Sequence, residues 1–588
     1  MDSTFILLTL AMSSLSMSGA AKTNRPNVIL VVTDDQGIGN LGCMGNPYIK
    51  TPNIDKFSED CVRLTNFHVN PLSTPTRGAI ITGRYAIHNG AWSTIKGRDI
   101  VSPRTPTIAE VFTKNGYQSA LFGKWHLGDN YPCRPCDCGF GHVVQHLSGG
   151  VGELSDYWGN NYFDDTYLVN NVPSQFKGYC TDVWFSEAIK YMDQHKDDEA
   201  PMFIYLATNA PHGPHRVAEK YSKPYEYLKS KHQDMPGFYG QITNIDENFG
   251  KLLDFMEKEN LVDNTILIFM TDNGAARGKD MCNNGYRGWK TSNLDGGHRV
   301  FFFIRWPAGK ITGNKEINTL ACHVDLLPTL AGMCNLKLAK HMELDGMDIS
   351  SIFKGDDKQV KDRVMYVHNR QDCLPPFDVE ASCVMKNEWR LLDGKKLYDV
   401  ASDRKQQKDV AATHQALKDS LLDANRAFIA ESKTKPEYKD FIAITVGNKQ
   451  QKVSVLTIQH AIGVADGMWK SVQVAEGVKN PNDMHVVNFE SDGVYKISFA
   501  RWPRECQGTI WGIPQENPKD LFNYRSIRPE AASLSLNGKE TIAKITEDMK
   551  EIDFKLKVKK GRTTLKANFL EGQEKYGVYY IYIEKCNY

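Results

Sequence analysis

The sequence predicts an α/β fold on a mostly parallel sheet, joined to a smaller antiparallel α+β subdomain and a C-terminal β-sandwich. Four continuous apolar runs occur in the first 300 residues, separated by segments with helical periodicity. This pattern is typical of parallel strands that are buried on both faces. After about residue 435 the pattern changes to short alternating strands broken by Gly, Pro, Asn and Asp, which indicates a β-sandwich.

Each of the four apolar runs ends in a cluster of polar residues. The runs cover residues 27–33, 117–122, 202–208 and 265–271, and the clusters after them begin at Asp34, Gly123, Asn209 and Asp272. Helices are expected between the runs, at residues 107–115, 179–194 and 239–259. Ligands of open α/β sheets bind beyond the carboxyl ends of the strands, so we expect the four clusters to converge on one site.

The remaining chain divides by pattern. We expect a catalytic α/β domain over residues 22–335, the antiparallel subdomain over 336–435 and the sandwich over 436–588. The sandwich carries no catalytic constellation. Its aromatic residues are interpreted as core, with sugar binding by exposed Trp or Tyr as the alternative.

The end of the α/β domain and the subdomain contain four predicted elements. A helix is expected over residues 321–334, paired strands at 389–392 and 396–400, and a charged amphipathic helix at 409–432. Together they predict a small antiparallel sheet with a packed helix, attached to the main sheet.

Residues 1–21 are predicted to be a signal peptide. Residues 5–12 form an apolar core, followed by small residues up to Ala21, an arrangement typical of exported proteins. The apolar run is too short to span a bilayer, so we expect an exported protein without a membrane span. The formal net charge of +1 gives no electrostatic case for binding nucleic acid.

The 13 cysteines fit a compartment in which disulfides form. Because the number is odd, at least one is expected to be free or paired between chains. Cys133, Cys136 and Cys138 crowd one loop. A local disulfide is favoured there over a zinc site, because no second pair of ligands matches them.

The stretch Ser73-Thr74-Pro75-Thr76-Arg77 is predicted to begin a helix. Proline is tolerated in a first helical turn, where its missing N–H costs little. Ser73 then lies at the helix start, where backbone N–H groups favour an anion. Arg77 lies one turn further on and is placed to fold back toward Ser73. Taken alone, the stretch also fits a simple helix cap with an arginine nearby.

Oxygen donors gather at two of the strand ends. Asp34, Asp35, Asp272 and Asn273 offer hard oxygen ligands without a thiolate, a set that suits calcium or magnesium better than zinc. Each pair alone fits a helix cap or an Asx turn equally well. Two such pairs at two strand ends favour a metal site.

Six cationic or imidazole side chains are expected near the same crevice. Together with a divalent cation they describe a pocket for a small, multiply charged oxyanion, as sulfuryl or phosphoryl transfer requires. Position 73 would supply the nucleophile. The six are Arg77, Lys124, His126, His212, Lys290 and His298.

Together these motifs resemble the type I, formylglycine-dependent sulfatases. The resemblance rests on Ser73-x-Pro75-x-Arg77 with Thr82-Gly83-Arg84, on Thr33-Asp34-Asp35-Gln36-Gly37, on Gly123-Lys124-Trp125-His126-Leu127-Gly128 and on Thr271-Asp272-Asn273-Gly274. It covers roughly residues 25–430, with the motifs in the family's order. It implies an alkaline-phosphatase-like fold and a serine-type enzyme of an anaerobic bacterium, exported to the periplasm or the medium.

The resemblance also implies the cofactors. Ser73 would be oxidised to formylglycine by a radical-type maturase before export, and would then serve as nucleophile and as a ligand of one calcium ion. The other calcium ligands would be Asp34, Asp35, Asp272 and Asn273. In that family one hydroxyl of the hydrated aldehyde attacks sulfur and the other expels sulfate, so water need not hydrolyse the intermediate.

The remaining roles follow from the same resemblance. Arg77 and His126 would stabilise the aldehyde hydrate, and His126 would assist collapse of the sulfated intermediate. Lys124, His212 and Lys290 would hold the sulfate. One of Lys290 or His212 would help to protonate the leaving oxygen.

The stretch from Asp295 to Phe301 departs from the family pattern of Glu-Gly-Gly, an aliphatic residue, Arg and Val-Pro. His298 takes the aliphatic position and Phe301 the proline position. His298 is expected either to contact the substrate or to be a packed histidine. Lys290 keeps the family's spacing of five residues before Asp295.

The leading hypothesis is a hydrolase that removes sulfate from an exported carbohydrate of the galactose or hexosamine type, acting on chain ends. Residues 212–215, Trp92, Trp158 and Tyr162 lie on loops that would shape a sugar pocket. One alternative is a phosphomonoester, phosphodiester or phosphonate hydrolase of the same superfamily that uses Ser73 or Thr74 unmodified. The other is a non-catalytic glycan-binding protein.

Overall fold

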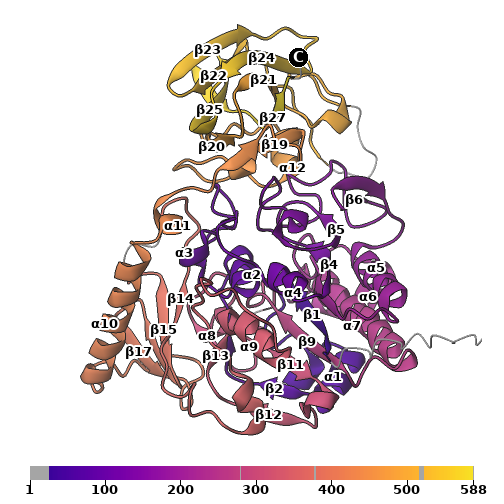
Figure 1. Cartoon of the computed structure of the whole chain (residues 1–588), viewed down its shortest axis with the longest axis vertical. Helices are drawn as coiled ribbons and strands as arrows, with labels where there is room; N and C mark the ends of the chain where they lie inside the picture. Colours follow the sequence, from indigo (N-terminus) through magenta and orange to yellow (C-terminus); the bar gives the residue numbers. More distant parts are fainter. Residues whose placement is uncertain (1–24, 279, 376–378, 515–521, 587–588) are drawn as a thin grey trace, which may run out of the picture.

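The computed structural model describes residues 25–278, 280–375, 379–514 and 522–586. The predicted signal peptide lies outside the described residues. Figure 1 shows two lobes: a large lower lobe built on the central sheet, and a smaller upper lobe of β-strands from the C-terminal part of the chain.

The large lobe is built on a ten-stranded sheet in the order β12-β2-β11-β9-β1-β8-β4-β5-β6-β7. Its five central strands are parallel. They are β9 (Thr265–Thr271), β1 (Asn27–Thr33), β8 (Met202–Ala207), β4 (Gln118–Lys124) and β5 (His142–His146). The four predicted runs are β1, β4, β8 and β9, so the parallel core of the sheet agrees with the prediction.

The edges of this sheet are mixed rather than parallel. Antiparallel pairing joins β11 to β9 and β2, and β6 to β5 and β7, whereas β12 and β2 are parallel. These strands are too short for a clear pattern of apolar residues. They are β2 (Val62–Leu64), β6 (Thr166–Val169), β7 (Val172–Gln175), β11 (Phe302–Arg305) and β12 (Lys315–Ile317).

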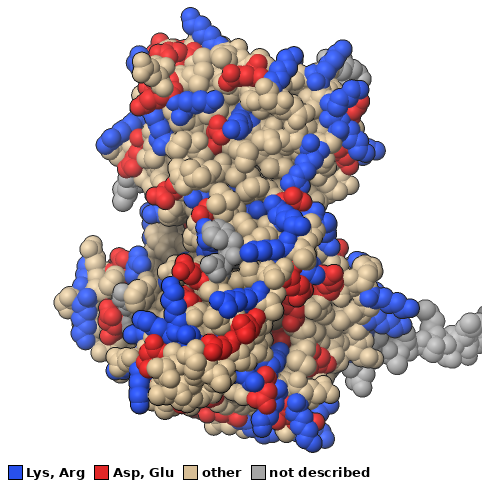
Figure 2. Space-filling model, turned by 90° about the vertical axis from the view of Figure 1, so that its left-hand side faces the viewer, with Lys and Arg blue, Asp and Glu red and all other residues tan. Residues whose placement is uncertain are grey.

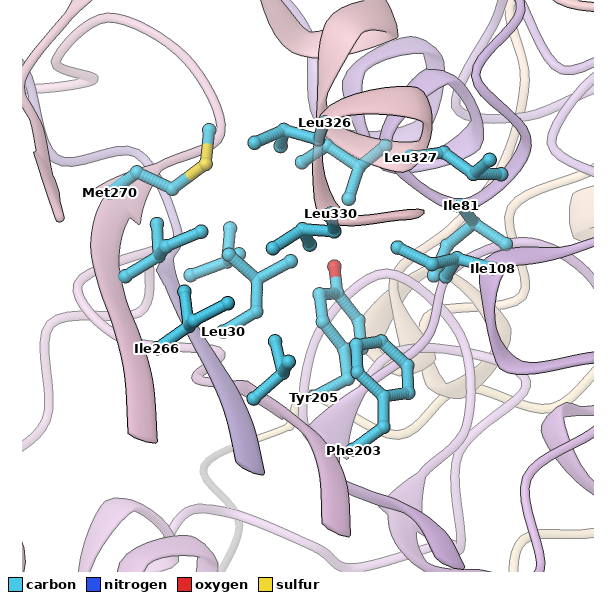
Figure 3. Close-up of a cluster of buried hydrophobic side chains, with 14 of the residues drawn as sticks. Leu30, Ile81, Ile108, Phe203, Tyr205, Ile266, Met270, Leu326, Leu327 and Leu330 are labelled. Carbon is cyan, nitrogen blue, oxygen red and sulfur yellow. The ribbon is translucent and has the colours of Figure 1, made fainter. Parts of the chain in front are cut away.

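Helices cover both faces of the sheet because successive side chains of a strand point to opposite faces. Val28, Leu30 and Val32 pack in one buried cluster, with α2 (Ser73–Thr82), α4 (Ile108–Lys114) and α9 (Leu326–Met333). Figure 3 shows Leu30 and Ile266 of the sheet beneath Ile81, Ile108 and Leu330 of these helices.

The opposite face of the sheet has its own cluster. Ile29 and Val31 pack there with α1 (Pro52–Glu59), α5 (Cys180–His195) and α7 (Met235–Lys258). A strand that is buried on both faces therefore accounts for the uninterrupted apolar run at residues 27–33. The short helices are α3 (Ala86–Asn89), α6 (Glu219–Ser222), α8 (Asp295–His298), α11 (Pro436–Lys439) and α12 (Ser471–Ala475).

Two predicted helices begin later than expected. The segment 321–334 opens as strand β13 (Ala321–Cys322), which joins β3 (Phe67–His68) and β10 (Arg299–Val300) in a three-stranded sheet. The helix expected from residue 409 begins at Gln415 as α10 (Gln415–Ser432). The Asp409 carboxylate accepts from the backbone N–H groups of Leu397 and Ala411 and holds a turn there instead.

The antiparallel subdomain contains a four-stranded sheet. Its order is β14 (Met365–His368), β15 (Ser382–Lys386), β16 (Trp389–Leu392) and β17 (Lys396–Asp399), and every pair is antiparallel. Strands β16 and β17 correspond to the predicted pair. Leu421 of α10 packs on Val384, Leu391 and Leu397 of this sheet.

The C-terminal lobe consists of two sheets that share one hydrophobic cluster. One contains β18 (Ile444–Val446), β20 (Met484–Phe489), β25 (Gly561–Glu571), β22 (Ala531–Leu536), β23 (Lys539–Lys544) and β26 (Glu574–Gly577). The other contains β19 (Val453–Thr457), β27 (Tyr580–Lys585), β21 (Gly493–Ala500) and β24 (Glu551–Val558). Phe569 of the first and Ile497 of the second both lie in the shared cluster.

The predicted disulfide in the loop of residues 133–138 is wrong for this structure. All 13 cysteines lie in the described part of the chain, and all are free thiols. The Cys133 thiol is directed at the carbonyl of Val101 (3.3 Å) and the Cys138 thiol at that of Pro132 (3.9 Å), so the two point to different partners. Across the described residues, no helix is long and apolar enough to cross a membrane.

Charged residues of both signs are scattered over both lobes on the face that Figure 2 shows. This agrees with the formal net charge of +1.

Candidate active site

The register of the central strands brings their polar ends together. Thr33 pairs with Thr271 at the ends of β1 and β9, and the Asp272 N–H then donates to the Thr33 carbonyl at 3.0 Å. The Asp34 N–H donates to the Ala210 carbonyl, which follows β8, at 3.1 Å. The segments after β1, β8 and β9 therefore meet beyond the carboxyl ends of these central strands, as the rule for open sheets predicts.

Three carboxylates gather at these strand ends. Asp34, Asp35 and Asp272 are fully buried, and one oxygen of each lies within 4.8 Å of the others. Burial and the Asp272 carboxylate raise the pKa of Asp34 well above its usual range. So much negative charge in a buried space requires compensation by positive charge.

Two oxygens of this cluster have no hydrogen-bond partner among the described residues. They are Asp34 Oδ1 and Asn273 Oδ1, both buried. The Asn273 amide group donates to Asp35 Oδ1 at 2.8 Å, so its oxygen is turned away from that carboxylate. Carboxylate and amide oxygens without a donor are the ligands that calcium or magnesium takes, so the residues fit a hard divalent cation.

Asp35 adopts the left-handed backbone region, with φ of 62°. This region is strained for residues other than glycine and occurs at functional sites. Two hydrogen bonds hold it: the Asp35 N–H donates to Asp272 Oδ1 at 3.1 Å, and the Ala276 N–H donates to the Asp35 carbonyl at 3.3 Å. In this conformation the Asp35 carboxylate lies in the cluster, where it accepts from Asn273 and Lys290.

Helix α2 positions Ser73 and Arg77. Ser73 is the first helical residue and is 2% exposed, whereas Arg77 is completely buried. Arg77 Nε donates to Ser73 Oγ at 3.2 Å, and Arg77 Nη2 donates to Asp272 Oδ2 at 2.8 Å. The guanidinium also donates to the Tyr205 hydroxyl at 3.4 Å, so strands β8 and β9 fix its position.

His126 approaches Ser73 from the other side. Its Nδ1 lies 3.4 Å from Ser73 Oγ, and its Nε2 lies 3.2 Å from the Thr94 carbonyl. A carbonyl only accepts, so Nε2 carries the proton and Nδ1 presents a lone pair to Ser73. Burial and the nearby Lys124 lower the pKa of His126 well below its usual range, which keeps the ring neutral.

Two lysines contact the carboxylates. Lys124 Nζ lies 2.6 Å from Asp34 Oδ2, and Lys290 Nζ lies 2.8 Å from Asp35 Oδ2. Burial lowers the pKa of Lys124. Burial alone would also lower the pKa of Lys290, but the Asp35 carboxylate reverses this and raises it.

His212 lies beside Lys290. Its Nδ1 donates to the Gly213 carbonyl at 2.8 Å, and its Nε2 lies 3.8 Å from Asp35 Oδ2. Burial and the Lys290 ammonium lower the pKa of His212 to about 3. The structure thus brings together Asp34, Asp35, Ser73, Arg77, Lys124, His126, His212, Asp272, Asn273 and Lys290.

The structure does not bring His298 into this group. Its side chain is completely buried, its Nδ1 lies 2.9 Å from His68 Nδ1, and its Nε2 lies 3.1 Å from the Asn293 carbonyl. Both ring nitrogens therefore have partners inside the protein. Of the two expectations for His298, the structure favours the packed histidine over a substrate contact.

A cleft of about 650 Å³ opens onto the site. Asp35, His212 and Lys290 line its inner part, and residues 213–216 line one side. Trp92, Trp158 and Tyr162 do not line it. Trp92 and Tyr162 are buried, and Trp158 packs against Trp502 at 5.4 Å between ring centroids. The side chains of these three therefore do not form the cleft wall, although residues 159–161 of the loop that carries Trp158 and Tyr162 line it.

Several cleft residues were not predicted. Glu153 follows strand β5, which is not among the predicted strands, and the Gly-rich stretch 149–152 before it was an available signal. Trp469 and Lys470 belong to the C-terminal lobe. Nothing in the sequence places them at the carboxyl ends of the central strands, because only the packing of the two lobes does so.

Known proteins with similar sequences share one activity class. A family model described as Sulfatase matches residues 26–336. The chain is similar to the N-acetylgalactosamine-6-sulfatase of Mus musculus, with 27% identity over 389 residues, 61% of this chain and 72% of the relative. It is also similar to the ulvan-active sulfatase of Formosa agariphila, with 29% identity over 399 residues, 62% of this chain and 73% of the relative.

Solved structures show the same fold. The crystal structure of Ps i-CgsB in complex with k-i-k-neocarrahexaose matches with a TM-score of 0.64 and 27% identity, over 71% of this chain and 95% of that one. The phosphonate monoester hydrolase of Agrobacterium radiobacter matches with a TM-score of 0.51 and 19% identity, over 69% of this chain and 96% of that one. The second likeness concerns the fold alone.

Proposed function

Because the chain belongs to the sulfatase family and is a sulfuric ester hydrolase, we propose that Ser73 is the precursor of its nucleophile and that its substrate is a sulfated glycan. The observation that carries the proposal is the position of Ser73 Oγ, between Arg77 Nε at 3.2 Å and His126 Nδ1 at 3.4 Å. It lies at the first residue of α2, where the helix N-terminus favours negative charge.

We assign Ser73 as the residue that a maturase oxidises to formylglycine before export. Arg77 would donate a hydrogen bond to an oxygen at this position and stabilise negative charge on it. His126 would accept a proton there, because its Nε2–H is committed to the Thr94 carbonyl and its Nδ1 is bare. The two residues thus divide charge stabilisation and proton transfer between them.

Asp34, Asp35, Asp272 and Asn273, with position 73, would hold one calcium ion. The unpartnered oxygens of Asp34 and Asn273 and the crowding of three buried carboxylates support this assignment. When bound, such an ion neutralises the carboxylates and polarises the oxygens of a sulfate group.

Lys124, His212 and Lys290 would bind the sulfate. Of the two candidates for protonating the leaving oxygen, the pKa shifts favour Lys290, since its pKa is raised while that of His212 falls to about 3. A group that is protonated at neutral pH can give a proton to the leaving alcohol; a neutral imidazole cannot.

Relatives support a glycan as the substrate class. One relative is an N-acetylgalactosamine-6-sulfatase, another is an ulvan-active sulfatase, and a similar structure holds k-i-k-neocarrahexaose. An exported enzyme would meet such polymers outside the cytoplasm, in agreement with the predicted signal peptide. A panel of sulfated monosaccharides identifies the hexose unit and the sulfated hydroxyl group.

The proposal is tested on protein purified from its native host. Mass spectrometry of the peptide that contains residues 73–77 should find Ser73 two hydrogen atoms lighter than serine. Ser73→Ala should abolish sulfate release from N-acetylgalactosamine 6-sulfate and from ulvan and carrageenan oligosaccharides, because no aldehyde can form. Ser230→Ala, an exposed serine elsewhere, serves as the control.

Two results would contradict the proposal. Sulfate release by Ser73→Ala would show that another group is the nucleophile, and Thr74 would then be tested next. Unmodified Ser73 together with hydrolysis of phosphate or phosphonate esters would favour the alternative chemistry.

A further inference from the structure

The C-terminal lobe is docked against the loop that follows strand β5. The Leu154 N–H donates to the Trp469 carbonyl at 2.8 Å, and Glu153 and Lys470 form a β-bridge. The Ser471 hydroxyl donates to the Gly152 carbonyl at 3.0 Å. In Figure 1, α12 lies at the junction of the lobes, next to this part of the large lobe. The backbone of residues 469–471 is therefore fixed against the catalytic unit.

A second set of contacts holds the same loop from strand β27. The Tyr580 hydroxyl donates to the Leu154 carbonyl at 2.8 Å, and its side chain is buried. Leu154 thus exchanges hydrogen bonds with two separate parts of the C-terminal lobe. Such a doubly anchored loop presents its neighbours in one defined position.

Because of this docking, Trp469 and Lys470 become part of the cleft wall. They line the same cleft of about 650 Å³ as Asp35, His212 and Lys290. That volume lies within the roughly 300–1,000 Å³ typical of ligand pockets and exceeds what a sulfate group needs. The cleft therefore continues from the sulfate-binding residues to the C-terminal lobe.

Trp469 has the properties of a stacking platform. It is 37% exposed, whereas most aromatic residues of the lobe lie in its core. A partly exposed indole on a cleft wall offers a large flat apolar face with little conformational freedom to lose. The C–H face of a pyranose ring matches such a surface in size and polarity.

The cleft also favours anions near this wall. Lys470 is exposed, and its ammonium lies 5.4 Å from the centroid of the Trp469 ring. Arg216 lines the cleft as well. Among the described lining residues, Arg216, Arg277, Lys290 and Lys470 are opposed by two carboxylates, those of Asp35 and Glu153. A second sulfate or carboxylate on the ligand would find cationic partners here.

We propose that the C-terminal lobe completes a second sugar subsite, in which Trp469 stacks on the sugar next to the one that carries the reacting sulfate and Lys470 pairs with an anionic group of that neighbour. The inference rests on the proposed function for the ligand class, a sulfated oligosaccharide. It assigns a binding role to residues 469–470, which the C-terminal lobe contributes to the cleft wall.

Binding is measured first, by calorimetry, with a carrageenan hexasaccharide and with ulvan oligosaccharides. Trp469→Ala should weaken the binding of at least one probe about tenfold or more, because an aromatic side chain that becomes buried on binding contributes strongly to affinity. Trp469→Phe should restore most of it, and Lys470→Met should weaken binding and reduce its dependence on salt. Tyr227→Ala and Lys449→Met, both exposed and outside the cleft, serve as controls.

Sulfate release is then compared on an oligosaccharide and on N-acetylgalactosamine 6-sulfate. Trp469→Ala should reduce the ratio of kcat/KM for the oligosaccharide to kcat/KM for the monosaccharide about tenfold. Oligosaccharide binding that depends on Trp469 without sulfate release would overturn the proposed function and leave the subsite intact. Equal binding by wild type and Trp469→Ala, or no binding of any oligosaccharide by the wild type, would overturn the subsite whatever the hydrolytic activity.

Discussion

At the scale of single residues, the acid cluster shows how charge and hydrogen bonding divide the work between similar side chains. Burial opposes ionisation at both Asp35 and Asp34. The Lys290 ammonium, together with the Asn273 hydrogen bond, overcomes it and holds the pKa of Asp35 well below its usual range. At Asp34, burial and Asp272 prevail and raise the pKa. The pKa values of two adjacent residues are thus shifted in opposite directions. A cation at the cluster would favour the ionised form of Asp34.

Asn273 provides the sharpest test of that cation. Adding calcium to metal-free protein should raise the Tm, because an ion at a hundred times its Kd contributes about 2.7 kcal/mol to the free energy of unfolding. Asn273→Ala removes one of the proposed oxygen ligands and should reduce this increase in Tm. Differential scanning calorimetry with and without calcium measures the change in Tm for each protein.

Asn318→Ala, an exposed asparagine away from the cluster, should keep the full calcium increment. If both variants gain as much as the wild type, Asn273 is not a ligand.

At the scale of elements, the sheet and its loops set the geometry of the reacting groups. Strands β1 and β9 end in register, so the pairing of the two strands is enough to bring Asp34 and Asp272 together. His126, by contrast, has a positive φ of 57° and depends on its neighbours. Thr94 fixes one ring nitrogen, and Gly149 packs against the ring. Loop packing therefore determines where the imidazole points.

Gly149 tests this dependence. A Cβ at this position would lie 2.5 Å from His126 Cε1, so Gly149→Ala must displace the ring. We expect kcat to fall about tenfold to a hundredfold, because a displacement on the order of 1 Å costs that much in a reacting geometry. Sulfate release and the thermal unfolding temperature are measured together.

Gly141→Ala is the matched control, since its Cβ would meet the Ser119 carbonyl at an ordinary 3.5 Å. An unchanged kcat in Gly149→Ala would show that the ring has room to adjust.

Some elements could be predicted and others could not, for physical reasons. Residues 27–33 and 265–271 were predicted to the residue, because a strand buried on both faces has to be apolar throughout. The strands at the edges of the sheet are too short to show a period. Residues 321–322 have helical neighbours but pair with β3, so tertiary pairing overrides the local pattern.

The same division holds for the site. The chemistry of Ser73, Arg77 and the acidic pairs is local in sequence and could be recognised from short motifs. The cleft wall at Trp469 depends on a contact between residues more than 300 positions apart, Leu154 and Trp469. The thiol at Cys133 is directed at the Val101 carbonyl, and spacing alone does not reveal such a partner.

At the scale of the whole molecule, one ion-pair cluster joins the two lobes. His460 of the C-terminal lobe lies 2.8 Å from Asp99 Oδ2 through Nδ1 and 3.5 Å from Asp129 Oδ2 through Nε2. The site is buried. Burial alone would lower the pKa of His460, but the two carboxylates raise it to about 10. The imidazolium is therefore a charged link between the lobes at neutral pH.

His460→Gln should lower the free energy of unfolding by about 3–5 kcal/mol, as breaking a buried pair does. The pKa of His460 rises from about 6.5 in the unfolded chain to about 10 in the folded protein. Its stabilisation is thus complete below pH 6.5 and is lost as the pH rises through 10. The difference in the free energy of unfolding between wild type and variant, measured by urea denaturation, should therefore shrink from pH 6.5 to pH 10.

His341→Gln, an exposed histidine, should show no such pH-dependent difference. A constant difference from pH 6 to pH 10 would mean that His460 acts by packing alone.

The burial of Ser73 has a consequence for the order of events during synthesis. At 2% exposure, its side chain is out of reach of a modifying enzyme once α2 has packed under the sheet. Trp469 and Tyr580, which hold the loop at Leu154, are both made well after residue 73. An oxidation at position 73 therefore has to occur before α2 packs against the sheet, so it competes with folding in time.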